Sequence, residues 1–183
     1  GIVPGTDTDV EMDFRILDNS GEPMFFGQGW QGNGYMLCVS SGNFMFFGNS
    51  NQHGLGSKDV DFHLTVVDAT MTIVKDGTPI SGTPTTVITD ASNNKNLILF
   101  GTSGHMAKMR FYSMKIWKGK KLVRDLVPCY ETADGGRDGL WDFASGTFLP
   151  NASSTAFNRG EAVDRRNVAV VTATPGEVGT PIP

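Results

Sequence analysis

Short apolar or alternating stretches recur along this chain, and clusters of glycine, asparagine, serine and aspartate separate them. Such clusters suit tight turns, and residues 10–16 alternate between apolar and charged side chains, as a half-buried strand does. Residues 71–80 carry an Asp76-Gly77 pair between β-branched residues, which is typical of a hairpin. No stretch combines longer helical periodicity with capping residues. These patterns predict an all-β sandwich, jelly roll or barrel.

The size and charge of the chain narrow its class. Its 183 residues suffice for one core, and a formal charge of -4 favours no polyanion globally. No run reaches the roughly 18 apolar residues of a membrane span. Because the chain starts Gly-Ile-Val-Pro without an initiator Met, we expect a processed or excised piece. Residues 161–183 lack aromatics and fit a C-terminal extension or linker, with Val168–Thr172 as a further edge strand.

One basic run stands apart from this acidic chain. Seven of the fifteen Lys and Arg residues fall between Lys108 and Arg124, interleaved with three aromatic residues. This composition is a general indication of nucleic-acid binding, which requires aromatics and charges on one face. The alternation places most of the aromatics opposite the charges instead. The run therefore predicts two paired strands and no nucleic-acid partner.

The same run predicts an irregularity within its first strand. Met109 and Phe111 share one phase of the alternation, whereas Tyr112, Met114 and Ile116 share the other. A shift of one residue indicates a β-bulge near Phe111 and Tyr112, or burial on both faces. A tight turn at residues 118–119 then places three lysines at a hairpin tip, where they discourage edge-to-edge aggregation.

The segment RFYSMKIWKGKKLVRDLVPCYETADGGRDGLWDFASGTFLPNASSTAF resembles the C-terminal half of laminin-G-like, concanavalin A-like domains. The most similar version occurs in bacterial surface or secreted proteins and in phage structural proteins. Residues 1–16, 24–30 and 35–49 resemble the opening strands, so the likeness covers residues 1–160. The C-terminal positions that carry it are Arg110, Tyr112, Lys115, Ile116, Trp117, Leu122–Asp125, Pro128, Cys129, Gly139, Leu140, Asp142, Gly146, Phe148, Asn151 and Phe157.

This resemblance implies a two-sheet antiparallel β-sandwich, a concanavalin A-like jelly roll, with sheets roughly 10 Å apart. Domains of this kind often carry calcium on their rim loops. Asp134 and Asp138 are the candidate ligands here, with Asp142 nearby. Arg137 lies between the carboxylates and the EF-hand spacing is missing, which favours a solvated turn. No other cofactor is expected.

The two cysteines lie in strand-like segments. Cys38 falls in LCV and Cys129 in VPC, with no CxxC motif or neighbouring histidine. Two buried thiols are the simplest interpretation. One bridge across the sandwich stays open as an alternative, because the sequence alone does not establish the geometry of a pair.

Glucanases of the laminarinase and lichenase type share the concanavalin A-like fold, so their catalytic signature indicates whether this chain is expected to be an enzyme. Their signature resembles E-x-D-x-x-E, which supplies a nucleophile and an acid about 5 Å apart. Glu11 and Asp13 match its first two positions, but the third falls on Arg15 or Ile16. His53, His63 and His105 are scattered, and no nucleophile-elbow motif occurs. The chain is therefore expected to be no enzyme.

A binding or structural module remains. Sugar sites combine exposed aromatic rings with side chains that read hydroxyl groups. Trp30 also fits a core position at the end of a strand, and Trp141 in GLWDF is expected in the core. The candidate ligand-binding residues lie in two loops and beside the basic hairpin tip: Trp30, Gln31, Asn33, Tyr35, Asn49, Asn51, Gln52, His53 and Trp117.

Two functions stay open at this point. The first is carbohydrate recognition or adhesion as part of a larger extracellular or cell-surface protein. The second is a structural domain of a virion or surface assembly, whose partners are other protein chains. Exposed tryptophan and asparagine in an open groove favour the first, and a large exposed apolar patch or paired edge strands favour the second. A glycoside hydrolase is a distant third.

Overall fold

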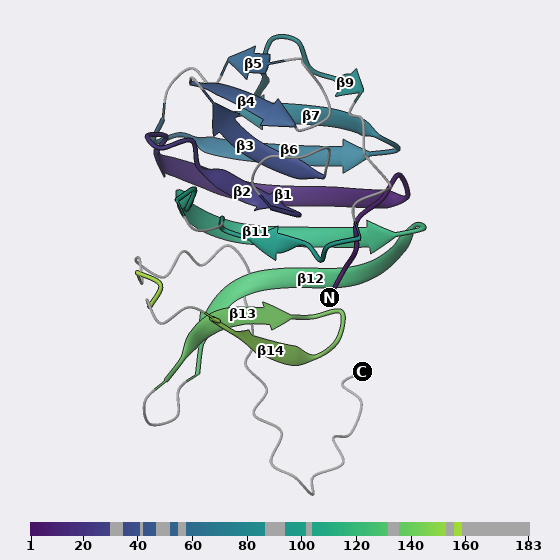
Figure 1. Ribbon diagram of the computed structural model, residues 1–183, viewed down its shortest axis with the longest axis vertical. Coiled ribbons are helices and arrows are strands. Elements are labelled where there is room, and N and C mark those ends of the chain that lie inside the picture. Colours follow the sequence, from purple (N-terminus) through teal and green to yellow (C-terminus); the bar gives the residue numbers. More distant parts are fainter. Residues whose placement is uncertain are drawn as a thin grey trace, which may run out of the picture.

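The computed structural model describes residues 1–29, 35–40, 42–46, 52–54, 58–86, 94–101, 104–131, 136–152 and 156–158. Over these ranges the chain forms fourteen β-strands and no helix. The strands make two antiparallel sheets, of nine and five strands, which confirms the expected all-β sandwich class (Figure 1). Among the described residues there is no helix long and apolar enough to cross a membrane.

The large sheet contains the longest strands. Its order is β14-β13-β12-β11-β1-β6-β7-β8, and β9 also pairs with β7. The bounds are β1 Thr8–Asp18, β6 Asp61–Val67, β7 Thr70–Lys75, β8 Thr78–Pro79, β9 Thr85–Thr86, β11 Lys108–Lys118, β12 Lys121–Tyr130, β13 Asp138–Asp142 and β14 Thr147–Pro150.

The small sheet has the order β10-β2-β3-β4-β5. In Figure 1 it overlies the part of the large sheet around β1, β6 and β11, whereas β13 and β14 extend beyond it. The bounds are β2 Met24–Gly27, β3 Met36–Ser40, β4 Asn43–Phe46, β5 Gln52–Gly54 and β10 Ile98–Leu99.

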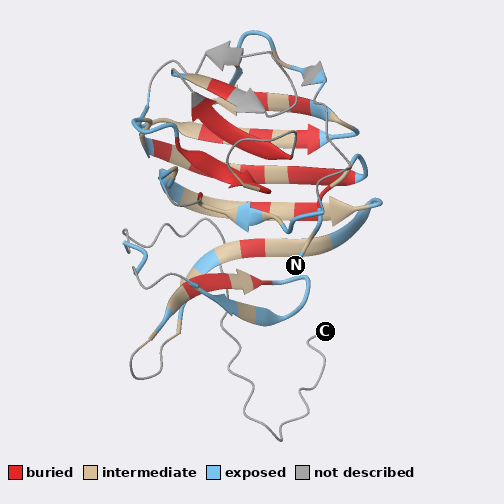
Figure 2. Cartoon of the chain, viewed as in Figure 1, coloured by how far each residue is buried: buried red, intermediate tan, exposed pale blue. Residues whose placement is uncertain are grey.

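Strand β1 confirms the alternation predicted for it. Its four apolar residues, from Val10 to Ile16, are fully buried, while Glu11, Asp13 and Arg15 between them are partly exposed (Figure 2). The side chains of a strand point alternately to its two faces. One face of β1 therefore packs in the core, and the other carries a row of charges.

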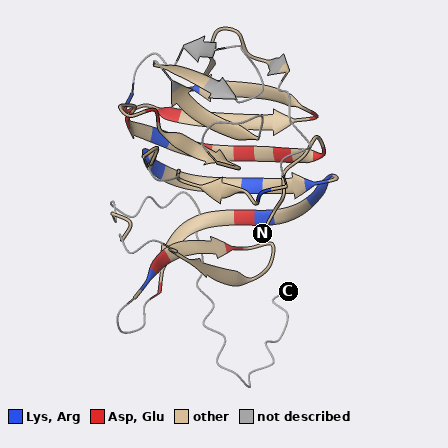
Figure 3. Cartoon of the chain, viewed as in Figure 1, with Lys and Arg blue, Asp and Glu red and all other residues tan. Residues whose placement is uncertain are grey.

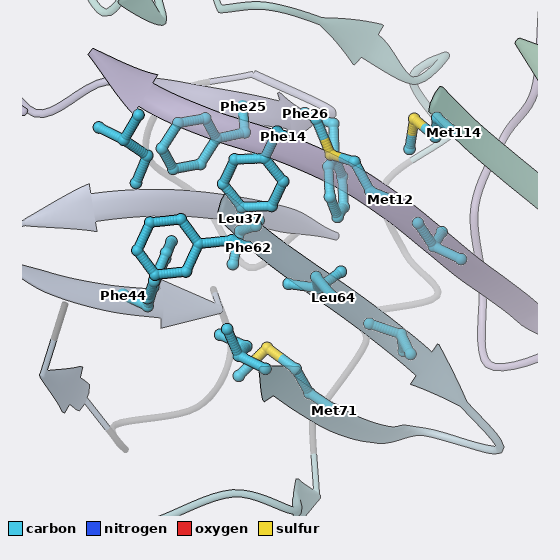
Figure 4. Close-up of a cluster of buried hydrophobic side chains, with 14 of the residues drawn as sticks. Met12, Phe14, Phe25, Phe26, Leu37, Phe44, Phe62, Leu64, Met71 and Met114 are labelled. Atoms are coloured by element: carbon cyan, nitrogen blue, oxygen red, sulfur yellow. The ribbon is translucent and has the colours of Figure 1, made fainter. Parts of the chain in front are cut away.

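The core between the sheets is rich in aromatic rings. Phe14 of the large sheet lies 5.2 Å from Phe25 and 5.6 Å from Phe62, centroid to centroid, with Phe44 at 6.3 Å (Figure 4). Phe44 also meets Phe62 edge to face at 5.2 Å. Such tilted and edge-to-face geometry is favourable beyond simple area burial. Phe14 thus connects both sheets.

The predicted bulge is present in β11. Asp13 pairs with Ser113 and Phe14 with Phe111, so Tyr112 is the extra residue. The sequence predicted that Tyr112 shares the apolar phase of Met114, and this prediction was wrong. Its hydroxyl donates to the Oδ1 atom of Asp61, on the charged face. The bulge lets one strand place apolar residues inward on both sides of it.

The basic run forms the predicted hairpin of β11 and β12. Gly119 and Lys120 at its tip have φ angles of 55° and 66°, as a two-residue primed turn requires. Lys118 pairs with Asp7, and Lys120 pairs with Asp68 and with the Oδ2 atom of Asp9 at 3.0 Å. Figure 3 shows this basic tip beside acidic residues of other segments. Much of its charge is therefore neutralised within the molecule.

These pairs predict a difference between adjacent lysines of the tip. Lys120→Ala should lower the melting temperature more than Lys121→Ala, because Lys120 bridges two carboxylates whereas the likewise exposed Lys121 forms no ion pair among the described residues. Salt screens exposed pairs, so the difference should shrink in concentrated salt. Thermal melts of both variants at low and high salt measure it. Equal melting temperatures at low salt would contradict this account of the tip.

Both cysteines are free thiols, and their surroundings differ. Cys38 is fully buried with Met24 and Met36, and burial, followed by the charge of Glu22, raises its pKa to about 12. Cys129 is only half-buried, which corrects the expectation of two buried thiols. Its pKa is also raised, first by burial and then by Glu131.

Candidate binding face

The charged side of β1 belongs to the face of the large sheet that points away from the small sheet. We call this surface the outer face and define it by the following residues. They are Glu11, Asp13 and Arg15 of β1, Asp61 and His63 of β6, Tyr112, Ser113, Lys115 and Trp117 of β11, Leu122 and Val127 of β12, Trp141 of β13 and Phe148 of β14.

Asp13 lies at the centre of the polar part of the outer face. It pairs in register with His63 on one side and with Ser113 on the other. Its Oδ1 atom lies 2.9 Å from Nδ1 of His63, and its Oδ2 atom accepts a 2.9 Å hydrogen bond from the Ser113 hydroxyl. Both carboxylate oxygens are thus held, and this orients the histidine ring.

A second polar group lies one row further along β1. Arg15 donates from Nε to Oδ1 of Asp61 at 2.9 Å, and the Tyr112 hydroxyl donates to the same oxygen at 2.8 Å. Burial, then the hydrogen bond to Asp61, raises the pKa of Tyr112. The hydrogen bond that Arg15 donates to Asp61 likewise raises the pKa of Arg15. The phenol therefore stays protonated and the guanidinium charged at neutral pH.

Glu11 lies at the other end of this polar region, on the opposite side of Asp13 from Arg15. Its Oε1 atom lies 4.0 Å from Nζ of Lys115, its cross-strand neighbour on β11. That separation is an ion pair without a direct hydrogen bond. Donor atoms of Glu11, Asp13 and His63 lie within 4.8 Å of one another.

Two apolar groups flank the polar part. Val127, Trp141 and Phe148 lie side by side across β12, β13 and β14, and each is partly exposed. Trp141 stands between the buried Leu140 and Asp142, so alternation turns it outward. The core position expected for Trp141 was therefore wrong. Leu140 and Asp142 fill the inner positions instead.

The second apolar group contains a tryptophan that the sequence had indicated. Trp117 pairs with Leu122 across the hairpin and stands two positions from Lys115, so alternation turns it to the outer face, where it is a half-buried candidate ligand contact. In the first apolar group, that of Val127, Trp141 and Phe148, the Arg137 guanidinium lies 5.7 Å from the centroid of the Phe148 ring. Two 2.7 Å hydrogen bonds to Glu131 orient that guanidinium.

The other predicted ligand contacts are distributed differently. Tyr35 is buried in the core, where its hydroxyl donates to the Thr8 carbonyl, so its ring does not offer a stacking surface. Gln52 and His53 begin β5, and their side chains lie outside the described residues. The remaining predicted contacts also lie outside them: Trp30, Gln31, Asn33, Asn49 and Asn51.

The calcium candidates do not form a described group. Asp134 lies outside the described residues, and Asp138 is the first residue of β13. Asp142 is fully buried and accepts hydrogen bonds from two backbone amides and from Ser145. Arg137 between them pairs with Glu131. Calcium binding stays a prediction.

The sequence indicated Trp117 but missed the group around Asp13. Asp13 and His63 are 50 positions apart, and Ser113 is 100 positions from Asp13. Only the strand order brings them together. A usable sequence signal was the alternation itself, which placed Glu11, Asp13 and Arg15 on one face.

Fold and face together define a two-sheet β-sandwich whose larger sheet has a polar, aromatic-flanked outer face. No family model matches the sequence, and no curated protein matches it either. A solved structure titled Trypanosoma rangeli sialidase in complex with the inhibitor DANA is similar at 16% identity and a TM-score of 0.43. The match covers 63% of this chain and 21% of that one. The chain thus spans about a fifth of that sialidase, and this degree of likeness carries no functional argument.

Proposed function

We propose that this chain is a non-catalytic binding module that recognises carbohydrate, or mediates adhesion, as part of a larger extracellular or cell-surface protein. The observation that supports it most is the outer face, where Trp117 and Trp141 lie on the same side of the sheet as polar side chains held by fixed contacts. A pyranose ring offers an apolar face and an edge of hydroxyl groups. Partly exposed indole rings and nearby carboxylate, imidazole and hydroxyl groups are complementary to both.

A glycan array with substituted proteins tests this proposal. We expect Trp141→Ala and Trp117→Ala each to weaken binding about 2- to 10-fold, because a stacked ring contributes about 0.5–1.5 kcal/mol. Tyr130→Ala is the matched control: its aromatic side chain is also exposed, but alternation places it on the inner side of β12. Trp30→Ala reports separately on the loop predicted from sequence.

The pattern of losses distinguishes the two surfaces. Binding that falls with the outer-face tryptophans and survives Tyr130→Ala supports the proposal. Binding that falls only with Trp30→Ala would move the site to the loop. If well-folded protein bound no glycan on the array, the proposal of carbohydrate recognition would be refuted and the assembly function would be favoured.

Assembly with other chains of a virion or surface layer is the second candidate. Exposed apolar residues near the end of the large sheet favour it, namely Tyr130, Phe143 and Leu149. Among the described strands β14 pairs with β13 alone, which leaves an edge able to accept another strand. Concentration-dependent association, measured by light scattering and weakened by Leu149→Asp, is the result expected for this candidate.

The non-catalytic part of the proposal rests on Asp13 and Glu11. Both oxygens of Asp13 are engaged by His63 and Ser113, and Lys115 lies near Glu11. The position of a third carboxylate on β1 holds Arg15, which pairs with Asp61. A retaining glycosidase requires one carboxylate free to attack the sugar and a second carboxyl group as acid, whereas both oxygens of Asp13 already make contacts. Turnover of any β-glucan by the purified chain would refute this part.

A further inference from the structure

The polar centre of the outer face brings together three residues of metal-binding type. Glu11 and Asp13 are two positions apart on β1, so both carboxylates lie on the same side of the sheet. His63 is the direct cross-strand neighbour of Asp13 on β6. Adjacent central strands thus present two carboxylates and one imidazole from a hydrogen-bonded backbone. A frame of this kind keeps the ligands' spacing without help from loops.

The spacing of the donor atoms suits a single ion after small adjustments. One donor atom from each residue lies within 4.8 Å of the others. Two ligands at about 2.1 Å from a tetrahedral zinc ion are about 3.4 Å apart. The donors therefore need to approach by up to about 1.4 Å. Side-chain rotation supplies such a movement, because Glu11, Asp13 and His63 are 36%, 35% and 42% exposed.

The contacts of the histidine also suit a metal ligand. Nδ1 of His63 faces Oδ1 of Asp13 at 2.9 Å. A metal ion competes with the proton shared by these two atoms, so binding would replace this hydrogen bond and use Nδ1 and Oδ1 as two of the ligands. Among the described residues, the Glu11 carboxylate makes no hydrogen bond, and Lys115 is 4.0 Å away. A cation replacing that weak pair would displace no direct hydrogen bond of Glu11.

We propose that Glu11, Asp13 and His63 form a binding site for one divalent transition-metal ion of the zinc class. Two carboxylates and an imidazole supply a charge of −2 and one nitrogen, a set suited to Zn²⁺ or Mn²⁺. Calcium requires six to eight oxygen ligands and gains little from imidazole. The remaining coordination positions face solvent. This site is separate from the rim-loop calcium site predicted from sequence, and it does not depend on carbohydrate binding.

Titration of the chelator-treated protein with Zn²⁺ at neutral pH tests the site. We expect saturable binding of one ion by calorimetry, and a visible absorption band when Co²⁺ replaces Zn²⁺. His63→Ala and Glu11→Gln should each weaken binding at least about tenfold. Asp61→Asn is the matched control, because Asp61 is a carboxylate on the same face and strand pair but outside the trio. A thermal melt without metal verifies that every variant is folded.

The outcomes separate the site from adventitious binding. One-to-one binding that is lost in both trio variants and kept in Asp61→Asn supports the proposal. The absence of saturable Zn²⁺ and Co²⁺ binding by the folded protein would overturn it. Equal binding by the His63→Ala variant would overturn it too, because the ion would then lie elsewhere. Binding of Ca²⁺ with no response to Zn²⁺ would exclude a site that depends on imidazole.

Discussion

Phe14→Ala is expected to destabilise the chain by about 3–5 kcal/mol, the range for removing a large aromatic side chain from a packed core. Phe14 is fully buried, and its ring contacts those of Phe25, Phe44 and Phe62. The truncation loses the burial of the ring and leaves a cavity among aromatic partners that are themselves closely packed. A loss of this size approaches the whole free energy of unfolding of many domains.

Urea unfolding of the wild type and the variant measures this loss. Leu17→Ala is the matched control on the same strand, because Leu17 is 42% exposed and its truncation should cost less than about 0.5 kcal/mol. A loss below about 1 kcal/mol for Phe14→Ala would show that the two sheets do not pack through this ring. A variant too unstable to purify calls for Phe14→Leu, which should lie between the two.

Asp142→Ala is the second substitution with a large expected effect, of about 3–5 kcal/mol. The carboxylate is fully buried and accepts hydrogen bonds from the amides of Asp125 and Ala144 at 2.9 and 3.1 Å. It also accepts from the Ser145 hydroxyl at 2.7 Å, and Nε of Arg124 lies 3.6 Å away. Alanine leaves these partly buried donors without their acceptor and opens a cavity at a fully buried position.

Asp142 also predicts how stability depends on pH. Burial raises its pKa, but hydrogen bonds from Ser145 and two backbone amides, with the charge of Arg124, outweigh burial and lower it below the usual 3.8. A lowered folded-state pKa contributes stability that is complete above 3.8 and is lost as pH falls through the folded value. The difference between the wild type and Asp142→Ala should therefore narrow in acid.

Denaturant unfolding at neutral pH and at successively lower pH measures both effects. Asp142→Asn is the informative control, since it keeps one oxygen acceptor and nearly the same volume but has no charge. We expect its stability to lie between those of the wild type and Asp142→Ala. A difference between wild type and Asp142→Ala that stays constant as the pH is lowered below 3.8 would contradict the assigned pKa direction.

The sequence by itself determined the local features of this protein. The alternation from Val10 to Ile16, the Asp76-Gly77 turn and the basic hairpin are all present as predicted. Each depends on residues adjacent in the chain, through the two-residue period of a strand or the φ angles of a turn. The shift of phase around Tyr112 predicted the bulge for the same reason. The all-β class followed from many such strands without helices, whereas the two-sheet arrangement was implied only by the resemblance to laminin-G-like domains.

Only the tertiary structure decided which side chains meet. Lys120 joins Asp9 and Asp68, and Asp13 joins His63, across separations of 50 to 111 positions. Strand order sets these neighbours, and alternation within one strand contains no information about its partner. Trp141 illustrates the same limit. Its apolar character predicted a core position, but the inward positions of β13 are occupied by Leu140 and by Asp142, whose carboxylate has its own hydrogen-bond donors. The outer face, with its candidate metal ligands and flanking tryptophans, is a product of that pairing.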